Sequence, residues 1–135
     1  MKTYYKLSTI KKSLIISLIS ALIGGLQMAI FLPDGLSCLN GTSSLLDGIL
    51  FFMPVQMVIV FCLGLIDKKM TPYTILLFLT IFWLSINKEE FVDRKACWST
   101  FSDAEILKVV LLKSALTCTI CLLPLYFLLR KIYPS

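Results

Sequence analysis

The chain has 135 residues, of which 58% are hydrophobic, with a mean hydropathy of +0.88 and a net charge of +5. Soluble domains contain about 45–50% apolar residues, so this composition excludes an ordinary water-soluble domain and predicts burial in a lipid bilayer. We expect no nucleic-acid binding, because the basic residues are split among short segments and form no continuous patch. The chain has no histidine, which removes the commonest general base and zinc ligand, and we expect no catalytic residue, metal or cofactor.

Four apolar runs follow one another along the chain. Three of them have 20 to 22 residues, enough to cross a hydrocarbon core of about 30 Å as a helix that rises about 1.5 Å per residue. The third run, 72–86, has 15 residues and needs a thinner bilayer or an extension through Lys88, whose stem can reach the headgroups. The first run continues to Leu32, longer than the core of a cleaved signal peptide, so we interpret it as a retained helix.

The predicted fold is therefore all-α, a single integral membrane domain over residues 1–135. A soluble four-helix bundle would need polar stripes along its helices, and these runs are apolar almost all round. We expect a four-helix bundle with antiparallel, up-down-up-down helices. The predicted spans are about 13–32, 45–66, 72–88 and 109–129, and the predicted outward loops are 33–44 and 89–108.

The positions of lysine and arginine predict the orientation. Four crossings bring both termini and the 67–71 turn to one side, which collects eight of the 13 basic residues, whereas the other side mixes basic with acidic residues. By the positive-inside bias the termini are cytoplasmic, and we expect a multi-pass protein of a bacterial inner (plasma) membrane. The eight basic residues are Lys2, Lys6, Lys11, Lys12, Lys68, Lys69, Arg130 and Lys131.

Small residues define two helix-packing stripes. Small side chains at helical spacing let another backbone approach closely, which drives association where lipid offers no hydrophobic force. The two stripes are expected to be buried inside the bundle or in a homodimer seam. The first consists of Ser13, Ser17, Ser20 and Gly24, and the second of Ser114, Cys118 and Cys121.

The cysteines suggest one covalent link. Cys38 lies in the first predicted outward loop and Cys97 in the second, so a disulfide between them would join the loops in an oxidising compartment. The alternative is two unpaired thiols. Cys118 and Cys121 have the C-x-x-C spacing of thiol oxidoreductases, but they lie near the middle of a span, where we favour a packing role over a redox role.

Polar residues within the spans are candidates for a site. Gln27, Asp47, Gln56 and Lys113 are the side chains of interest, and an ionisable residue inside a membrane is a functional candidate by default. We consider two readings: Lys113 reaches outward to the headgroups from a shallow depth, or Asp47 and Lys113 form the walls of an outward-facing polar pocket.

Three classes of function fit these residues. The first is a non-enzymatic accessory or interaction protein that docks another membrane component, and in layout the chain is similar to small four-helix immunity proteins that block pore-forming bacteriocins. The second is a homodimeric transporter or lipid-linked flippase with Asp47 and Lys113 as substrate or coupling charges. The third, a membrane thiol oxidoreductase, is disfavoured because no C-x-x-C lies in an outward loop. The expected partners are the lipid bilayer and either a membrane protein or a second copy of the chain.

Overall fold

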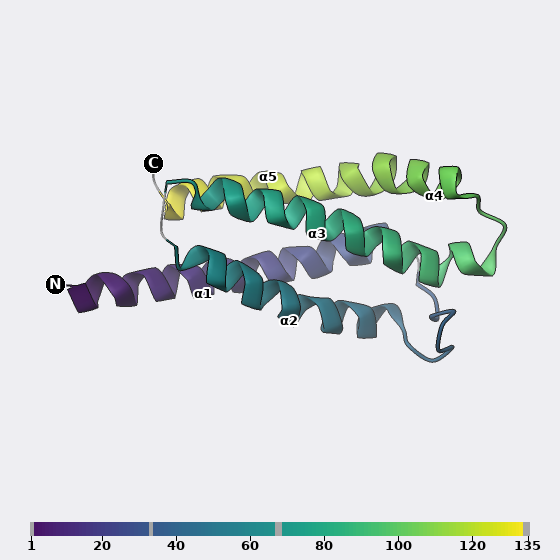
Figure 1. Cartoon of the computed structure of the whole chain (residues 1–135), viewed down its shortest axis with the longest axis horizontal. Helices are drawn as coiled ribbons and strands as arrows, with labels where there is room; N and C mark the ends of the chain where they lie inside the picture. The colour runs from purple at the N-terminus through teal and green to yellow at the C-terminus, as the bar shows by residue number, and fades with distance from the viewer. Residues whose placement is uncertain (1, 33, 67–68, 134–135) are drawn as a thin grey trace.

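The computed structural model describes residues 2–32, 34–66 and 69–133, with side chains from residue 8 onward. These residues form helices and connecting segments with no strand, and the long helices lie side by side (Figure 1). Both termini lie at one end of the bundle, called here the terminal end, and segments 34–44 and 95–102 lie at the opposite loop end (Figure 1). Of the basic residues that predict the orientation, Lys68 and the side chains of Lys2 and Lys6 lie outside the described residues.

The described residues form four long helices, of which the last has three parts. This last helix changes at its second turn from α-helical to π-helical hydrogen bonding and then returns to α-helix. The elements in chain order are α1 (Lys2–Phe31), α2 (Leu45–Gly64), α3 (Thr71–Arg94), the 3-10 helix η1 (Ala96–Trp98), α4 (Asp103–Val109), the π-helical turn η2 (Val110–Ser114) and α5 (Ala115–Ile132).

Three helices of the described chain are long and apolar enough to cross a membrane. They are Ser8–Phe31, Leu45–Gly64 and the continuous helix Asp103–Ile132. Helix α3 differs because its apolar part, 72–86, is short and is followed by two charged turns. Three of the four predicted spans therefore correspond to helices that are long and apolar enough to cross a membrane, and α3, which contains the predicted span 72–88, is not among them.

The second predicted loop, 89–108, is wrong in its extent. Helix α3 continues to Arg94, and α4 begins at Asp103, so only residues 95–102 connect the long helices. Ser102 caps α4 by accepting from the backbone N–H of Glu105, whose carboxylate accepts from the backbone of Ser102 in return. This capping box satisfies the free amides of the first turn, so the helix begins before the apolar run does.

Helix α3 occupies the centre of the packing. It contacts α1, α2, α4, η2 and α5, and it buries Ile75, Leu79 and Trp83 in an apolar cluster that fills the terminal half of the bundle. A second apolar cluster, which includes Met28 and Phe91, fills the loop half. Buried polar side chains of α1, α3 and η2 lie close to the junction of the two clusters, and Phe82 packs against both clusters.

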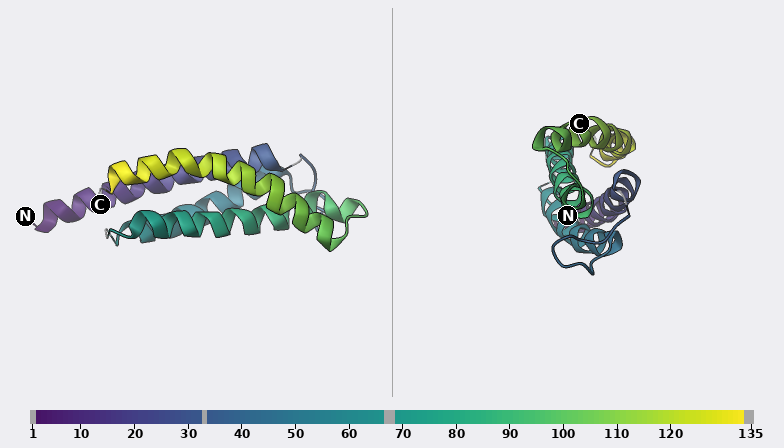
Figure 2. Two further views of the ribbon diagram at one scale, coloured as in Figure 1. Left: turned by 90° about the horizontal axis from the view of Figure 1, so that it is seen from above. Right: turned by 90° about the vertical axis from the view of Figure 1, so that its right-hand side faces the viewer.

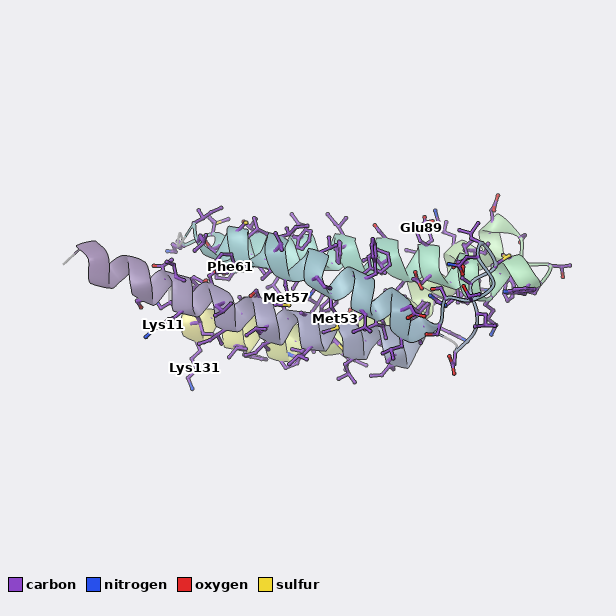
Figure 3. The ribbon with its side chains drawn as sticks, turned by 90° about the horizontal axis from the view of Figure 1, so that it is seen from below. Lys11, Met53, Met57, Phe61, Glu89 and Lys131 are labelled. Carbon is purple, nitrogen blue, oxygen red and sulfur yellow. A yellow bond between two sulfur atoms is a disulfide. The ribbon has the colours of Figure 1, made fainter. Side chains whose placement is uncertain are left out.

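The small residues of α1 face α2. The side chain of Ser13 donates to the backbone oxygen of Phe61, and a side chain at Gly64 would collide with Ser13. Met53, Met57 and Phe61 lie along α2 (Figure 3), and Met53 lies close to Gly25. The interior contains every residue of the two predicted stripes: Ser13, Ser17, Ser20, Gly24, Ser114, Cys118 and Cys121.

Candidate functional site

A layer of hydrogen-bonded amides crosses the interior of the bundle. The Asn87 Nδ2 atom donates to Gln27 Oε1 at 2.8 Å, and Gln27 Nε2 donates back to Asn87 Oδ1 at 3.2 Å. The Asn87 Nδ2 atom also donates to Ser114 Oγ at 2.6 Å. Each of these three side chains is fully buried and each comes from a different helix. This amide layer (Gln27, Asn87 and Ser114) therefore ties α1, α3 and η2 together.

The buried thiol of Cys118 extends the amide layer by one turn. Its Sγ atom donates to Gln27 Oε1 at 3.5 Å and lies 3.8 Å from Ser114 Oγ. Cys121, at the other end of the C-x-x-C spacing, is also buried in the apolar cluster. The two cysteines thus belong to the packed interior of the bundle, which supports a packing role for them.

A second polar pair, Trp83 and Gln56, lies one helical turn away and links α2 to the other helices. The Trp83 indole donates to Gln56 Oε1 at 2.7 Å, and Gln56 Nε2 donates to the backbone oxygen of Ser20 at 2.6 Å. These groups pack over Gly24, where an added Cβ atom would lie 2.6 Å from Gln56 Oε1. A glycine is therefore required at position 24 to leave room for the hydrogen bonds.

The interior polar groups are mutually satisfied. Within the described part of the chain, no buried side-chain nitrogen or oxygen lacks a hydrogen-bond partner. A buried amide without a partner costs free energy, so this closure stabilises one arrangement of the helices. The layer consists of neutral groups, and its hydrogen bonds hold the helices together.

At the loop end, a buried arginine fixes the first connecting segment. The Arg94 side chain is 1% exposed, and its Nε atom pairs with Glu90 Oε2 at 2.6 Å. Its Nη1 atom donates to the backbone oxygens of Gly35 and Ser43, each at 2.9 Å. Gly48 permits this approach, because a Cβ there would lie 2.7 Å from Glu90.

The same segment is attached to α3 and η1 at three further points. The Asp93 carboxylate accepts from the backbone N–H groups of Cys38 and Leu39, at 3.1 and 3.2 Å. Cys38 and Cys97 lie at disulfide-bonding distance with their Cα atoms 6.3 Å apart, the pairing that the sequence predicts. The Trp98 indole donates to the backbone oxygen of Leu36. We name residues 34–44 and 93–98 together the loop-end cap.

The loop-end cap carries apolar side chains on its surface. Leu39 is 91% exposed, Trp98 is 65% exposed and Leu36 is 53% exposed. All three lie close in the chain to Cys38 or Cys97, so the cysteine pair and the hydrogen bonds of the neighbouring backbone hold them in position. An exposed apolar group on a well-anchored surface is suited to docking.

The four predicted pocket residues lie in different places. Gln27 and Gln56 are interior hydrogen-bonding groups, whereas Asp47 and Lys113 are exposed. Asp47 is the N3 residue of a capping box and accepts from the backbone N–H of Ser44 at 2.7 Å. Lys113 lies in η2 at the rim of a groove that Asp47 does not line. The arrangement therefore does not bring Asp47 and Lys113 together.

Sequence reasoning missed Arg94, Asn87 and Trp83. The i,i+4 spacing of Glu90 and Arg94 was a readable sign of an ion pair on a continuing helix. Asn87 and Trp83 share a face of α3 at helical spacing, but nothing local shows which amide they meet. In the described residues, no group of three metal-binding side chains is present.

Comparisons with known proteins provide no relative from which a function could be transferred. The sequence matches no protein-family model, and neither a curated protein nor a solved structure matches it at a significant level. A function for this chain therefore has to be argued from its own contacts.

Proposed function

We propose that the chain is a non-enzymatic accessory protein of a bacterial inner membrane, which docks another membrane component through its loop-end cap. In this proposal the bundle crosses the membrane four times with antiparallel, up-down-up-down helices, and both termini are cytoplasmic. The observation that carries it is the cap itself, because exposed Leu36, Leu39 and Trp98 are held on a segment that is anchored by the cysteine pair and by Arg94.

The charges at the two ends support this orientation. Lys11 and Lys131 lie at the terminal end and Glu89 lies at the loop end (Figure 3). The terminal end and the 67–71 turn contain eight of the 13 basic residues of the sequence, and this excess of lysine and arginine is what the positive-inside bias expects on the cytoplasmic side. Helix α3 is packed among three helices that are long enough to span a membrane, which supports a fourth crossing by α3 beside them.

The construction of the cap supports docking. A partner that binds a preformed surface loses less conformational entropy than one that binds a mobile loop. Tryptophan and leucine provide large apolar contact areas, and Trp98 keeps its N–H satisfied while most of its side chain remains exposed. The expected partner is an apolar or aromatic segment of a membrane protein that reaches the outer interface. An immunity-type role is the specific form of this proposal, because a pore-forming toxin would approach from that side.

A site-specific photo-crosslinker tests the docking surface in intact membranes. The reagent is placed at Leu36, and capture is compared between wild type, the Leu39→Ala/Trp98→Ala double variant and the control Leu116→Ala/Phe127→Ala. The control changes two exposed apolar residues of α5 that lie outside the cap. We expect one discrete protein adduct that the cap variant loses and the control variant keeps.

Two results would overturn the docking proposal. One is an adduct that consists of lipid alone, and the other is a protein adduct whose yield the cap variant does not change. An adduct with a second copy of the chain would show that the partner is the chain itself, in a homodimer. The immunity form makes a further prediction: cells that produce the chain should survive a pore-forming bacteriocin, and the cap variant should lose this protection.

A further inference from the structure

A groove opens at the loop end between α1 and the last helix. Its volume is about 430 Å³, and it is lined by residues of α1, of the end of α3, and of α4 and η2. Phe31, Phe91 and Phe101 contribute aromatic rings, and Phe91 meets the other two at centroid distances of 6.2 and 5.7 Å. Lys95 and Lys113 are exposed and also line the groove, and its lining contains no carboxylate.

The arrangement of the helices explains why the groove exists. Seen end-on, the helices form an arc, and α1 and the last helix are its two ends (Figure 2, right). Helix α1 packs along α2 and meets α5, whereas its last turn borders the groove opposite Val109 and Lys113. The side of the groove is therefore open toward the surroundings of the bundle, which in the proposed placement is lipid.

The depth of Lys113 sets the chemistry of the groove. It follows Lys108 by five residues, so it lies more than one helical turn further along the helix axis. The neighbouring residue, Ser114, is held in the amide layer, which ties η2 to α3 at this level. An ammonium group at this depth is costly unless it reaches the headgroups or pairs with an anion, and a lipid phosphate beside it supplies both. Lys95, from the end of α3, adds a second cation to the same groove.

We propose that this groove binds an anionic phospholipid of the outer leaflet. The phosphate lies between Lys95 and Lys113, and an acyl chain runs along Phe31 and the neighbouring apolar side chains of α1. A phosphate provides the counter-charge that the lining lacks, and an apolar chain matches the aromatic floor. The inference rests on the proposed membrane placement, and it is independent of docking through the cap.

Lipid retention measured by native mass spectrometry tests the site. Wild type is reconstituted in bilayers of equal parts phosphatidylglycerol and phosphatidylcholine, extracted in mild detergent and scored for the lipid that stays bound. The test variant is Lys95→Gln/Lys113→Gln. The matched control, Lys88→Gln/Lys108→Gln, removes the same charge from two exposed lysines outside the groove.

We expect wild type and the control to retain phosphatidylglycerol in preference to phosphatidylcholine. At about a tenfold change for 1.4 kcal/mol, and about 1 kcal/mol for each lysine near an anionic surface, the test variant should lose this preference by about thirtyfold. The Lys95→Arg/Lys113→Arg variant keeps the charge and should restore retention, which separates the effect from a failure to fold.

Three outcomes would overturn the lipid site. Wild type could retain the two lipids equally, or the glutamine variant could retain as much phosphatidylglycerol as the control. In the third, inorganic phosphate binds the lipid-free protein and competes away the phospholipid with the same lysine dependence, which would identify a site for a soluble anion. Wild-type protein that stays in the supernatant after ultracentrifugation without detergent, by contrast, would overturn the proposed membrane placement as a whole.

Discussion

The amide layer and the loop-end cap both bury polar groups, but they use different chemistry. In the amide layer, neutral side chains from three helices satisfy one another, and no charge is buried there. In the cap, Arg94 pairs with Glu90 of the preceding helical turn and donates to backbone carbonyls, and together with a cysteine pair it holds a connecting segment in place. Neutral amides suit a region surrounded by apolar helices, whereas a charged network has a tolerable desolvation cost only near water. The comparison predicts that variants in the cap lower the free energy of unfolding by more than variants in the amide layer.

The largest effect is expected from Arg94→Ala. The substitution leaves Glu90 without its counter-ion and removes the donor to Gly35 and Ser43, and loss of one partner of a buried ion pair costs about 3–5 kcal/mol. The free energy of unfolding in mixed micelles, followed by circular dichroism, measures it. The control is Lys88→Ala, an exposed charge on the same helix. An equal loss in the two variants would contradict the role of Arg94.

Breaking the cysteine pair should have the next largest effect. Cys38 and Cys97 are 59 residues apart, and a disulfide that closes such a loop contributes roughly 2–4 kcal/mol. Cys38→Ser and Cys97→Ser should each lower the unfolding free energy and abolish the mobility change on reduction in electrophoresis. Cys62→Ser, a change at an exposed cysteine of α2, should do neither. A mobility change that persists in both Cys38→Ser and Cys97→Ser would show that these two cysteines are not joined.

Gly24→Ala tests the packing of the interior by adding a single Cβ atom. The new Cβ would lie 2.6 Å from Gln56 Oε1 and 2.9 Å from the Trp83 indole nitrogen, so the hydrogen bonds must shift, at a cost of about 1–3 kcal/mol. Gly25→Ala is the matched control because its nearest neighbour is the flexible Met53 side chain. Tryptophan fluorescence in a Trp98→Phe background reports on Trp83 alone and should shift only in Gly24→Ala. Identical spectra for the two variants would refute the close contact.

The smallest effect is the pairwise coupling between Gln27 and Asn87. A double-mutant cycle with Gln27→Leu and Asn87→Leu should give about 0.6 kcal/mol and at most about 1.7 kcal/mol, the range measured for hydrogen bonds between membrane helices. The comparison cycle uses Gln56→Leu with Asn87→Leu, whose hydrogen-bond partners differ, and should give less. Equal couplings in the two cycles would mean that the amide pair has no specific energy.

The helices and some of their ends were predictable from local sequence. The apolar runs predict the long helices, and the serine and acidic residues three positions apart at 44 and 47 and at 102 and 105 are capping boxes that mark two helix starts. Asp47 is one of these capping residues, so the reading that makes it a wall of a pocket with Lys113 is not what the structure places there. A capping carboxylate is a local signal, readable from the serine three residues before it.

The candidate site was predictable only in part. Cys38 and Cys97 could be paired because they alone among the cysteines lie outside the apolar runs. Gln27 and Gln56 could be picked out as polar residues within those runs, but their partners could not, since Asn87 and Trp83 are 60 and 27 residues away. Arg94 was assigned to a loop, and its burial depends on a connecting segment that is distant in the chain.

The sequence by itself determined the helical class and three helices apolar enough to span a membrane, because these depend on hydropathy and length along one chain, and it singled out Cys38 and Cys97 as a candidate pair. Tertiary structure alone decided which amides meet, that Arg94 is enclosed, and that Lys95 and Lys113 share one groove. The physical reason is that side chains from four separate helices are brought within hydrogen-bonding distance only by how the helices pack. That packing depends on small residues such as Gly24 and Gly48, which make room for specific partners on neighbouring helices.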